Sequence, residues 1–413
     1  MSNIKNAIVG QSGGPTAAIN ATLAGVIEGA LASENINAIY GMRYGIEGFL
    51  AENIVRLDEI FGDDGENLKL LKQTPAAYLG SCRKKLPSPN SDKAEDIAIY
   101  EKLFAILEKL NIGYFFYIGG NDSMDTVAKM SVYAEKIGSD IKLIGVPKTI
   151  DNDLMATDHT PGFGSAAKYI ATVAQEIIRD CAVYTVKAVT VIEIMGRDAG
   201  WLTAASAIGG DVSGYAPDYV YLPEVAFDTE AFLEDVAAAF EKHPNVVIAV
   251  SEGVRLADGR YVGEATQSGS VDIFGHKYLG GTGNTLIDAV KARFGCKVRA
   301  VELNLPQRCA GHLLSKTDIE ESVRIGAAAV AAATSGVSGE MMLFERAQGS
   351  EYECSIGHKS VMDIANAARC VPREFINERG NNVTDACVDY LKPLIAGEYP
   401  VIFKDGIPEH ICL

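Results

Sequence analysis

The chain has 413 residues, of which 48% are hydrophobic and 22% are charged, so we expect a well-packed globular protein of two or three domains. Its formal charge of −17 excludes general nucleic-acid binding, which needs a basic face. No apolar run reaches the roughly 18 residues of a membrane span and no signal peptide is evident, so we expect no membrane partner. Eight cysteines without CxxC spacing predict free thiols in a reduced, cytoplasmic protein.

Strand signals and helix signals alternate along the chain. The strand signals are short apolar runs, at residues 4–9, 36–40, 114–118, 141–146, 188–194, 246–250 and 297–303. The helix signals have an apolar face, at residues 17–31, 94–110, 124–137, 164–179, 228–242, 282–293 and 317–333. This alternation predicts right-handed βαβ units and an α/β fold with largely parallel sheets. The tail from Val371 is less regular, and we expect it to pack back onto the body.

Two polar loops follow neighbouring strand signals. The sequence GGNDS at residues 119–123 comes directly after the apolar run 114–118, and PKTIDND at residues 147–153 comes after the run 141–146. Open α/β sheets bind ligands at the carboxyl ends of their strands. We therefore expect both loops to line one site.

The PKTIDND loop carries residue types that suit phosphoryl transfer. Lys148 can neutralise charge on a transferring phosphoryl group. Asp151 and Asp153, two residues apart, can divide the roles of proton acceptor and metal ligand. The alternative interpretation is an Asx-rich turn without a chemical role.

The GGNDS loop places bare glycine backbone beside a carboxylate. Asp122 or Ser123 could cap a helix that begins near residue 124, which is the structural alternative. Like charges repel strongly where water is scarce. A functional Asp122 therefore needs either a metal ion between it and the phosphate or a selective purpose.

Residues 10–16, GQSGGPT, close the first strand and open a helix, whose N-terminal N–H groups favour phosphate. The spacing is neither GxGxxG nor GxxxxGK[ST], which disfavours an NAD-dependent dehydrogenase. Arg83, in the basic sequence at residues 80–85, could hold phosphate oxygens in a bidentate manner. A tight βα turn and a solvated surface turn remain the respective alternatives.

Further polar groups follow the later strands. Gly196 could approach a sugar closely, Arg197 could bind a phosphate, and Glu252 could accept bonds from sugar hydroxyls. Arg299 and Arg308 lie nine residues apart around a strand and its exit loop, where they could converge on one phosphate dianion. Surface charge balancing in an acidic protein is the alternative for this pair.

The polar loops and charged residues described above, taken in their order between residues 10 and 308, resemble the phosphofructokinase family. The most specific pair of motifs is TIDND followed by MGRDAGWL (residues 195–202). The resemblance implies two Rossmann-like three-layer domains with mainly parallel sheets and an active site in the cleft between them. It implies phosphorylation of the C1 hydroxyl of fructose 6-phosphate with Mg²⁺ as cofactor. We expect a phosphoryl-donor domain at residues 1–158 with roughly 306–345, and a sugar-phosphate domain at 159–305 with roughly 346–413.

Two positions indicate the phosphoryl donor. In this family, ATP-dependent members typically carry glycine where this chain has Asp122, and bacterial ones also at Lys148, whereas pyrophosphate-dependent members carry aspartate and lysine. Asp122 would fill the space beyond the second phosphate and repel a nucleotide. The resemblance is therefore to the pyrophosphate-dependent branch, whose reaction is readily reversible. An ATP-dependent enzyme and a non-catalytic sugar-phosphate-binding regulatory subunit are the alternatives.

The resemblance also implies a role for individual residues. Asp151 is expected to be the base, assisted by Lys148, Asp122, Thr149 and Asp153. The expected pyrophosphate contacts are Gly13, Gly14, Arg83 and Gly120. The expected sugar-phosphate contacts are Thr149, Ile150, Asp151, Met195, Gly196, Arg197, Glu252, Arg299, Arg308 and Lys187. The expected metal contacts are Asn121 and Asp122.

Three positions depart from the family pattern. Asn121 replaces an aspartate at the magnesium site, and an amide oxygen is a neutral, weaker ligand. Leu305 replaces a histidine near the 6-phosphate, and Ala188 replaces an arginine whose charge the adjacent Lys187 could supply. Because such 6-phosphate contacts often cross a subunit boundary in this family, we expect a homodimer or homotetramer.

Overall fold

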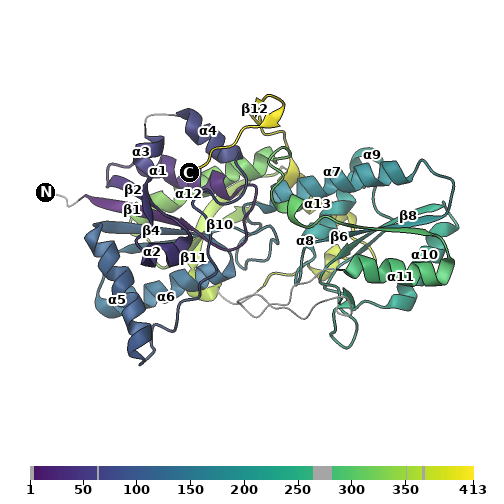
Figure 1. Cartoon of the computed structure of the whole chain (residues 1–413), viewed down its shortest axis with the longest axis horizontal. Coiled ribbons are helices and arrows are strands. Elements are labelled where there is room, and N and C mark those ends of the chain that lie inside the picture. Colours follow the sequence, from purple (N-terminus) through teal and green to yellow (C-terminus); the bar gives the residue numbers. More distant parts are fainter. Residues whose placement is uncertain (1–3, 63–64, 264–280, 350, 365–367) are drawn as a thin grey trace.

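The computed structural model describes residues 4–62, 65–263, 281–349, 351–364 and 368–413. The chain forms two α/β halves that lie side by side, each built around one sheet (Figure 1). The two-domain α/β architecture expected from the sequence is confirmed.

The first half contains a seven-stranded sheet in the order β11-β10-β5-β4-β1-β2-β3. Its inner strands are parallel, and the two edge strands β3 and β11 are antiparallel to their neighbours. The strands are β1 (Lys5–Gln11), β2 (Ile36–Met42), β3 (Ile54–Arg56), β4 (Ile112–Gly119), β5 (Lys142–Pro147), β10 (Glu340–Arg346) and β11 (Cys354–Ser360).

Helices cover both faces of this sheet. One face carries α1 (Ile19–Leu31), α3 (Leu57–Phe61), α4 (Gly65–Gln73) and α12 (Lys316–Thr334), and the other carries α2 (Gly45–Leu50), α5 (Ala94–Lys109) and α6 (Asn121–Ile137). Phe115 faces one apolar core and Phe116 the other, which explains why β4 is a continuous apolar run. The backbones of α1 and α12 touch, because a Cβ on Gly25 would lie 2.0 Å from the Val323 carbonyl oxygen.

The second half contains a four-stranded parallel sheet in the order β7-β8-β6-β9. Its strands are β6 (Ala188–Ile194), β7 (Tyr219–Tyr221), β8 (Asn245–Ser251) and β9 (Lys297–Glu302). One face packs on α7 (Phe163–Cys181), α8 (Trp201–Ala205) and α13 (Asp385–Leu391), and the other on α10 (Thr229–Phe240) and α11 (Thr282–Phe294). The short helix α9 (Gly209–Ser213) lies against α7. The 3-10 turns are η1 (Ser206–Ile208), η3 (Leu305–Arg308), η4 (Val361–Asp363), η5 (Arg373–Phe375) and η6 (Lys392–Ile395).

The C-terminal part of the chain divides between the halves. Residues 346–413 were expected with the second half, but β11 extends the first sheet by pairing with β10. The segment with Val371 and Leu394 packs into the core of the second half. The final hairpin, β12 (Phe403–Lys404) and β13 (Ile407–Pro408), lies beside the first half, where the Gln73 amide donates to the Glu409 carbonyl at 2.7 Å.

Among the described residues, no helix has the length and apolar character needed to cross a membrane.

Candidate active site

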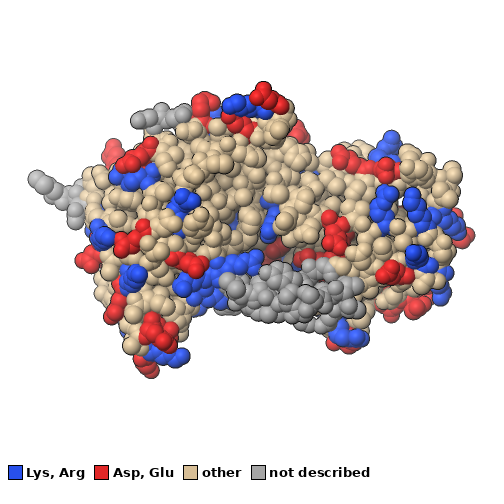
Figure 2. Space-filling model, in the orientation of Figure 1, with Lys and Arg blue, Asp and Glu red and all other residues tan. Residues whose placement is uncertain are grey.

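A cavity of about 570 Å³ lies between the two halves, at the carboxyl ends of strands from both sheets. The loops after β1, β4 and β5 line it from the first half, and those after β6 and β8 from the second. β1 and β4 are adjacent, yet their connections run to opposite sides of the sheet, which is the switch point at which open α/β sheets bind ligands. Although the whole chain is acidic, Lys and Arg side chains gather beside this junction on the face in Figure 2.

Most of the site residues expected from the sequence line this cavity. They are Gly13, Gly14, Arg83, Gly120, Asn121, Asp122, Lys148, Thr149, Ile150, Asp151, Asp153, Met195, Arg197, Glu252 and Arg308. Gly196 lies between two of them, and its N–H donates to Glu252 Oε1 at 3.4 Å. Pro15, Thr16, Ser123, Asp198 and Ala199 also line the cavity, from runs that the sequence marked without giving these residues a contact role, and Ala368 comes from a segment that the sequence did not mark.

Lys148 connects the loop after β5 with the glycine loop after β1. Its side chain is buried, and its Nζ donates to the Gly14 carbonyl oxygen at 2.6 Å. Gly13 has φ +80°, and a Cβ there would lie 3.2 Å from Lys148 Nζ, so this close approach requires glycine. Burial lowers the pKa of Lys148 to about 8, against the opposing attraction of Asp151.

The GGNDS sequence begins helix α6 instead of preceding it. The helix starts at Asn121, and the residue before it, Gly120, makes no side-chain cap bond. The expectation that Asp122 or Ser123 caps a helix from residue 124 is therefore wrong, because both lie in the first turn. Ser123 instead bonds to Ser12 across the sheet edge. Gly120, Asn121 and Asp122 at this helix start line the cavity, and the N-terminus of a helix favours an anion.

Asp122 is half-exposed and pairs with a lysine from the basic loop. Lys85 Nζ lies 3.1 Å from Asp122 Oδ1, and both side chains are nearly half-exposed. Pairs of this kind stabilise a fold by only about 0–1 kcal/mol. Fold stability alone is therefore a weak reason for a carboxylate at this position.

Local hydrogen bonds fix the PKTIDND loop. The Asp151 N–H donates to Thr149 Oγ1 at 3.1 Å, and Thr160 Oγ1 donates to the Thr149 carbonyl at 2.7 Å. Asn152 adopts φ +55°, which turns the two aspartates on either side of it into the cavity. The two carboxylates are thus held on one loop beside the Lys148 ammonium.

Three carboxyl groups in the cavity have raised pKa values. Burial raises the pKa of Asp151, and Lys148 and Arg197 oppose the shift. Burial and the neighbouring Asp151 raise the pKa of Asp153 to about 7 and that of Glu252 to about 7. Buried carboxyl groups with raised pKa values, set among cations in a cavity, are the pattern that marks acid–base sites.

Two of the expected phosphate contacts lie elsewhere. Arg299 is on the exposed edge strand β9, 3.8 Å from Asp180, and Lys187 lies over the Phe240 ring just before β6. Both precede the carboxyl ends of their strands, whereas Arg308 follows β9 in the turn η3 and reaches the cavity. Arg299 and Arg308 therefore do not converge within one chain.

A residue from the irregular tail supports the PKTIDND loop. The Arg369 N–H donates to the Asp153 carbonyl at 2.7 Å, and its guanidinium lies 4.4 Å from the Trp201 ring centroid. The same guanidinium donates to the Tyr390 hydroxyl at 3.0 Å, and Asn152 Nδ2 donates to that hydroxyl at 3.4 Å. No local sequence pattern marks Arg369, because its partners come from three other segments of the chain, at residues 152–153, 201 and 390.

The cavity has oxygen ligands that suit Mg²⁺. Asn121 Oδ1 is buried without a hydrogen-bond partner among the described residues, and the Asp122 carboxylate follows it in the same helical turn. Mg²⁺ prefers carboxylate and carbonyl oxygens together with water and substrate phosphates. A buried acceptor that lacks a donor is consistent with a cation at this place, so these residues fit the expected cofactor.

Known proteins resemble this chain over nearly its whole length. The phosphofructokinase family model matches residues 6–333. The chain is 40% identical to proteins named pyrophosphate--fructose 6-phosphate 1-phosphotransferase from Methylococcus capsulatus (99% of this chain, 96% of the relative) and Halomonas elongata (98% and 95%). The crystal structure of a pyrophosphate-dependent phosphofructokinase from Nitrosospira multiformis has a TM-score of 0.87 at 38% identity, over 98% of this chain and 96% of that one. The chain therefore belongs to the phosphofructokinase family.

Proposed function

We propose that this chain reversibly transfers a phosphoryl group from inorganic pyrophosphate to the C1 hydroxyl of fructose 6-phosphate. The products are fructose 1,6-bisphosphate and phosphate. The observation that carries the proposal is the meeting of Asp122, Lys148 and Asp151 in one cavity. Relatives that match almost the whole chain are named for this activity. We expect the enzyme in the cytoplasm, where its free cysteine thiols stay reduced.

Pyrophosphate binds between the glycine loop after β1 and the start of α6. Gly13, Gly14 and Gly120 leave the backbone open to close approach by phosphate oxygens. The N-terminus of α6 adds N–H groups and the positive end of a helix dipole. Arg83 supplies a guanidinium whose planar donors match phosphate oxygens.

The chemical step depends on Asp151. This carboxylate accepts the C1 hydroxyl proton while the hydroxyl oxygen attacks the nearer phosphorus in line. The P–O–P bond breaks, and phosphate leaves. A raised pKa suits a base that works near neutral pH. Lys148 stabilises negative charge on the transferred and departing groups, and Mg²⁺, when bound at Asn121 and Asp122, supplies further charge neutralisation.

The second half of the chain binds the sugar phosphate. Met195, Gly196, Arg197 and Glu252 lie at the carboxyl ends of β6 and β8, across the cavity from the pyrophosphate loops. In this arrangement Glu252 accepts bonds from sugar hydroxyls, and Arg308 contacts the 6-phosphate.

A dimer accounts for the remaining two cations. Arg299 and Lys187 are exposed and lie away from their own chain's cavity. The apolar side chains of Val183 and Val186 next to them are 70% and 64% exposed, which suits a covered subunit contact better than solvent. We infer that these cations reach the 6-phosphate in the partner's cavity.

Mixing two inactive variants tests this assembly. Arg299→Ala and Asp151→Ala homodimers are each expected to be nearly inactive. After denaturation and refolding together, a hybrid dimer combines both defects at one site and leaves the other site intact. Recovered activity approaching a quarter of the wild-type value supports a shared site, since half of the dimers are then hybrids with one good site. Without any recovery, Arg299 does not act across subunits.

The reaction itself is tested by following products. Wild-type protein with Mg²⁺, pyrophosphate and fructose 6-phosphate is expected to give fructose 1,6-bisphosphate and phosphate in equal amounts, detected by ³¹P NMR. Turnover with ATP alone would instead support the ATP-dependent alternative. A protein that binds fructose 6-phosphate but turns over neither donor would support the regulatory-subunit alternative.

The donor-selecting role of Asp122 is tested by two substitutions. Repulsion between Asp122 and a nucleotide's α-phosphate at about 4 Å amounts to about 1 kcal/mol in water and about 4 kcal/mol near a protein surface. Asp122→Gly is therefore expected to change the ratio of kcat/KM for pyrophosphate to that for ATP by at least about 5-fold in favour of ATP. Asp122→Asn separates charge from bulk, because it removes the charge alone. An unchanged ratio in both variants contradicts the role.

A further inference from the structure

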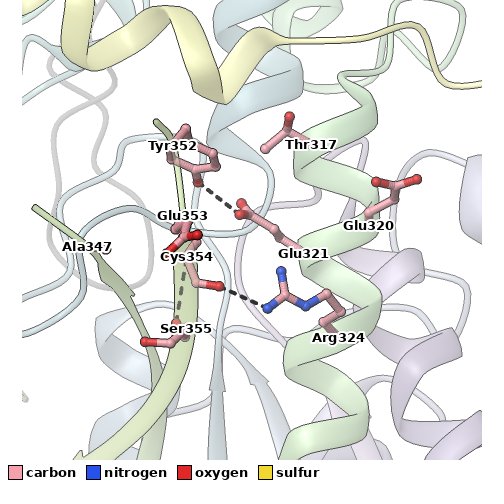
Figure 3. A pocket seen from close by; sticks show the side chains of 9 residues that line it. All are labelled: Thr317, Glu320, Glu321, Arg324, Ala347, Tyr352, Glu353, Cys354 and Ser355. Carbon is pink, nitrogen blue, oxygen red and sulfur yellow. Dashed lines mark hydrogen bonds between the residues drawn. The ribbon is translucent and has the colours of Figure 1, made fainter. Parts of the chain in front are cut away.

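A second cavity, of about 610 Å³, lies on the first half, outside the active site. Helix α12 forms one wall with Thr317, Glu320, Glu321 and Arg324, and strand β11 with the turn before it forms the other (Figure 3). In Figure 3 the Glu321 side chain points from the helix toward Tyr352, and Cys354 lies beside it on the strand. The phosphoryl-transfer reaction uses none of these residues.

Two of the lining residues, Glu321 and Cys354, meet the buried His159 behind the cavity wall, and all three are of types that can bind a metal ion. His159, Glu321 and Cys354 each offer a ligand atom, and these atoms all lie within 4.8 Å of one another. The histidine side chain is only 3% exposed and that of Glu321 only 6% exposed. They come from the connection between the halves, from α12 and from β11, so three segments distant in sequence place them together.

The partners of these side chains already orient them as ligands. The Asp158 carboxylate lies 2.9 Å from His159 Nδ1, which fixes the ring and directs Nε2 toward Glu321. Arg346 in turn donates to Asp158 at 3.0 Å. The Tyr352 hydroxyl donates to Glu321 Oε1 at 2.9 Å and leaves Oε2 directed at the histidine. Carboxylate–histidine pairs and hydrogen-bonded carboxylates are typical surroundings of zinc ligands.

We propose that His159, Glu321 and Cys354 bind one divalent transition-metal ion, with Zn²⁺ as the best match. Nitrogen, oxygen and sulfur ligands in a tetrahedral arrangement suit this ion, and tetrahedral bonds of 2.0–2.3 Å separate the ligand atoms by roughly 3.3–3.6 Å. His159 Nε2 and Glu321 Oε2 are 2.8 Å apart, so they need to move apart by only about half an ångström. The cavity gives water access to the fourth position.

The site has a charge balance that either a proton or a metal can satisfy. Without metal, a protonated His159 and Arg346 balance Asp158 and Glu321. With Zn²⁺, the neutral histidine, the Glu321 carboxylate and a Cys354 thiolate balance the ion, and the histidine and thiol protons go to solvent. Other charged groups at the cavity are Glu320, Glu353 and Arg324, which leave it negative overall and so attract a cation.

The bound ion would act on the structure and not on the chemistry. His159 follows the PKTIDND loop in the connection to α7, while Glu321 and Cys354 belong to the first half. Cross-linking these segments stabilises the folded chain by linkage, since only the folded state assembles the ligands.

Metal-stripped full-length protein tests the proposal directly. Titration with Co²⁺ is expected to give one equivalent of tetrahedral visible absorption and a thiolate-to-cobalt charge-transfer band in the near ultraviolet. Zn²⁺ should displace the cobalt and raise Tm. Cys412→Ser, which removes an exposed thiol elsewhere, should leave the bands unchanged.

Two variants make the test specific. Cys354→Ser should abolish the charge-transfer band and weaken Zn²⁺ binding by at least about 10-fold, while Mg²⁺-dependent activity stays at the wild-type value. Tyr352→Phe, which frees Glu321 Oε1 without removing a ligand, should weaken binding by about 10-fold. If wild type gives no thiolate band, or if Cys354→Ser binds Zn²⁺ as tightly as wild type, the proposal is wrong. If Cys354→Ser does not fold, the wild-type spectrum and Tyr352→Phe decide it.

Discussion

Replacing Lys148 with methionine isolates the contribution of one buried charge. The lysine side chain is 3% exposed, and its Nζ is held against the Gly14 carbonyl at 2.6 Å. Methionine has a similar volume and preserves packing, so Lys148→Met removes mainly the ammonium. We expect a large loss of kcat with a folded protein.

The expected magnitude follows from the position of this charge. An ammonium about 4 Å from a developing negative charge contributes about 4 kcal/mol at an effective dielectric constant of about 20. Arg83, Arg197 and Arg308 line the same cavity and share the stabilisation, so we expect about 2–4 kcal/mol from Lys148 itself. This corresponds to a fall in kcat of about 30- to 1,000-fold.

Steady-state kinetics with pyrophosphate measure this loss, and thermal unfolding verifies that the variant is folded. Lys148 also opposes the rise in the pKa of Asp151. In the variant, the fall of kcat/KM at acidic pH should therefore begin at a higher pH than in wild type. Lys69→Met is the matched control, because Lys69 is 60% exposed and forms a surface ion pair with Glu66. A folded Lys148→Met with kcat within about 3-fold of wild type would refute the assignment of this charge to the reaction.

Three further outcomes are expected. Asp151→Ala should lower kcat by at least about 10²-fold, and wild-type-like turnover would exclude it as the base. With Asp151 as the proposed base, its ionised form is the active one, and because its pKa is raised, kcat/KM should begin to fall with decreasing pH above the ordinary aspartate pKa of about 3.9. Asp198→Asn removes a charge that raises this pKa and should move the limb to lower pH; an unmoved limb contradicts the link. Arg369→Met should lower kcat by about 10-fold with little change in KM, as a positioning residue does; a change in KM alone would indicate substrate binding instead.

The sequence predicted the parts of the fold in which local pattern and tertiary position agree. β4 is buried on both faces and is therefore continuously apolar, and the α5 pattern begins at the same residue as the helix, Ala94. Neither β10 nor β11 is predicted from the sequence, because β10 takes its place by pairing with β5, far away in the chain, and β11 by pairing with β10. The final hairpin likewise depends on bonds to Gln73.

In the candidate site, too, the residues marked by a local pattern were predicted, and those placed by tertiary contacts were not. Glycine loops and carboxylates at strand ends were identified because each is a local signal at a position that the sheet then brings into one cavity. The start of α6 was placed three residues late, because Gly120 leads into the helix without a capping side chain. Arg369 was missed because it supports the site through tertiary contacts. The same holds for Gln307, which donates to the Asn304 carbonyl and accepts from the Met195 N–H. Arg299 was paired with Arg308 from sequence spacing, which does not reveal on which side of a strand a residue lies.

We propose that Asp122 and Lys148 together make pyrophosphate the phosphoryl donor of this enzyme. The most direct test is the ratio of kcat/KM for pyrophosphate to kcat/KM for ATP, measured on one wild-type preparation with saturating fructose 6-phosphate and Mg²⁺. We expect a ratio of at least about 10², since both charge repulsion at Asp122 and the filled space beyond the second phosphate act against the nucleotide. A ratio near or below one would contradict it.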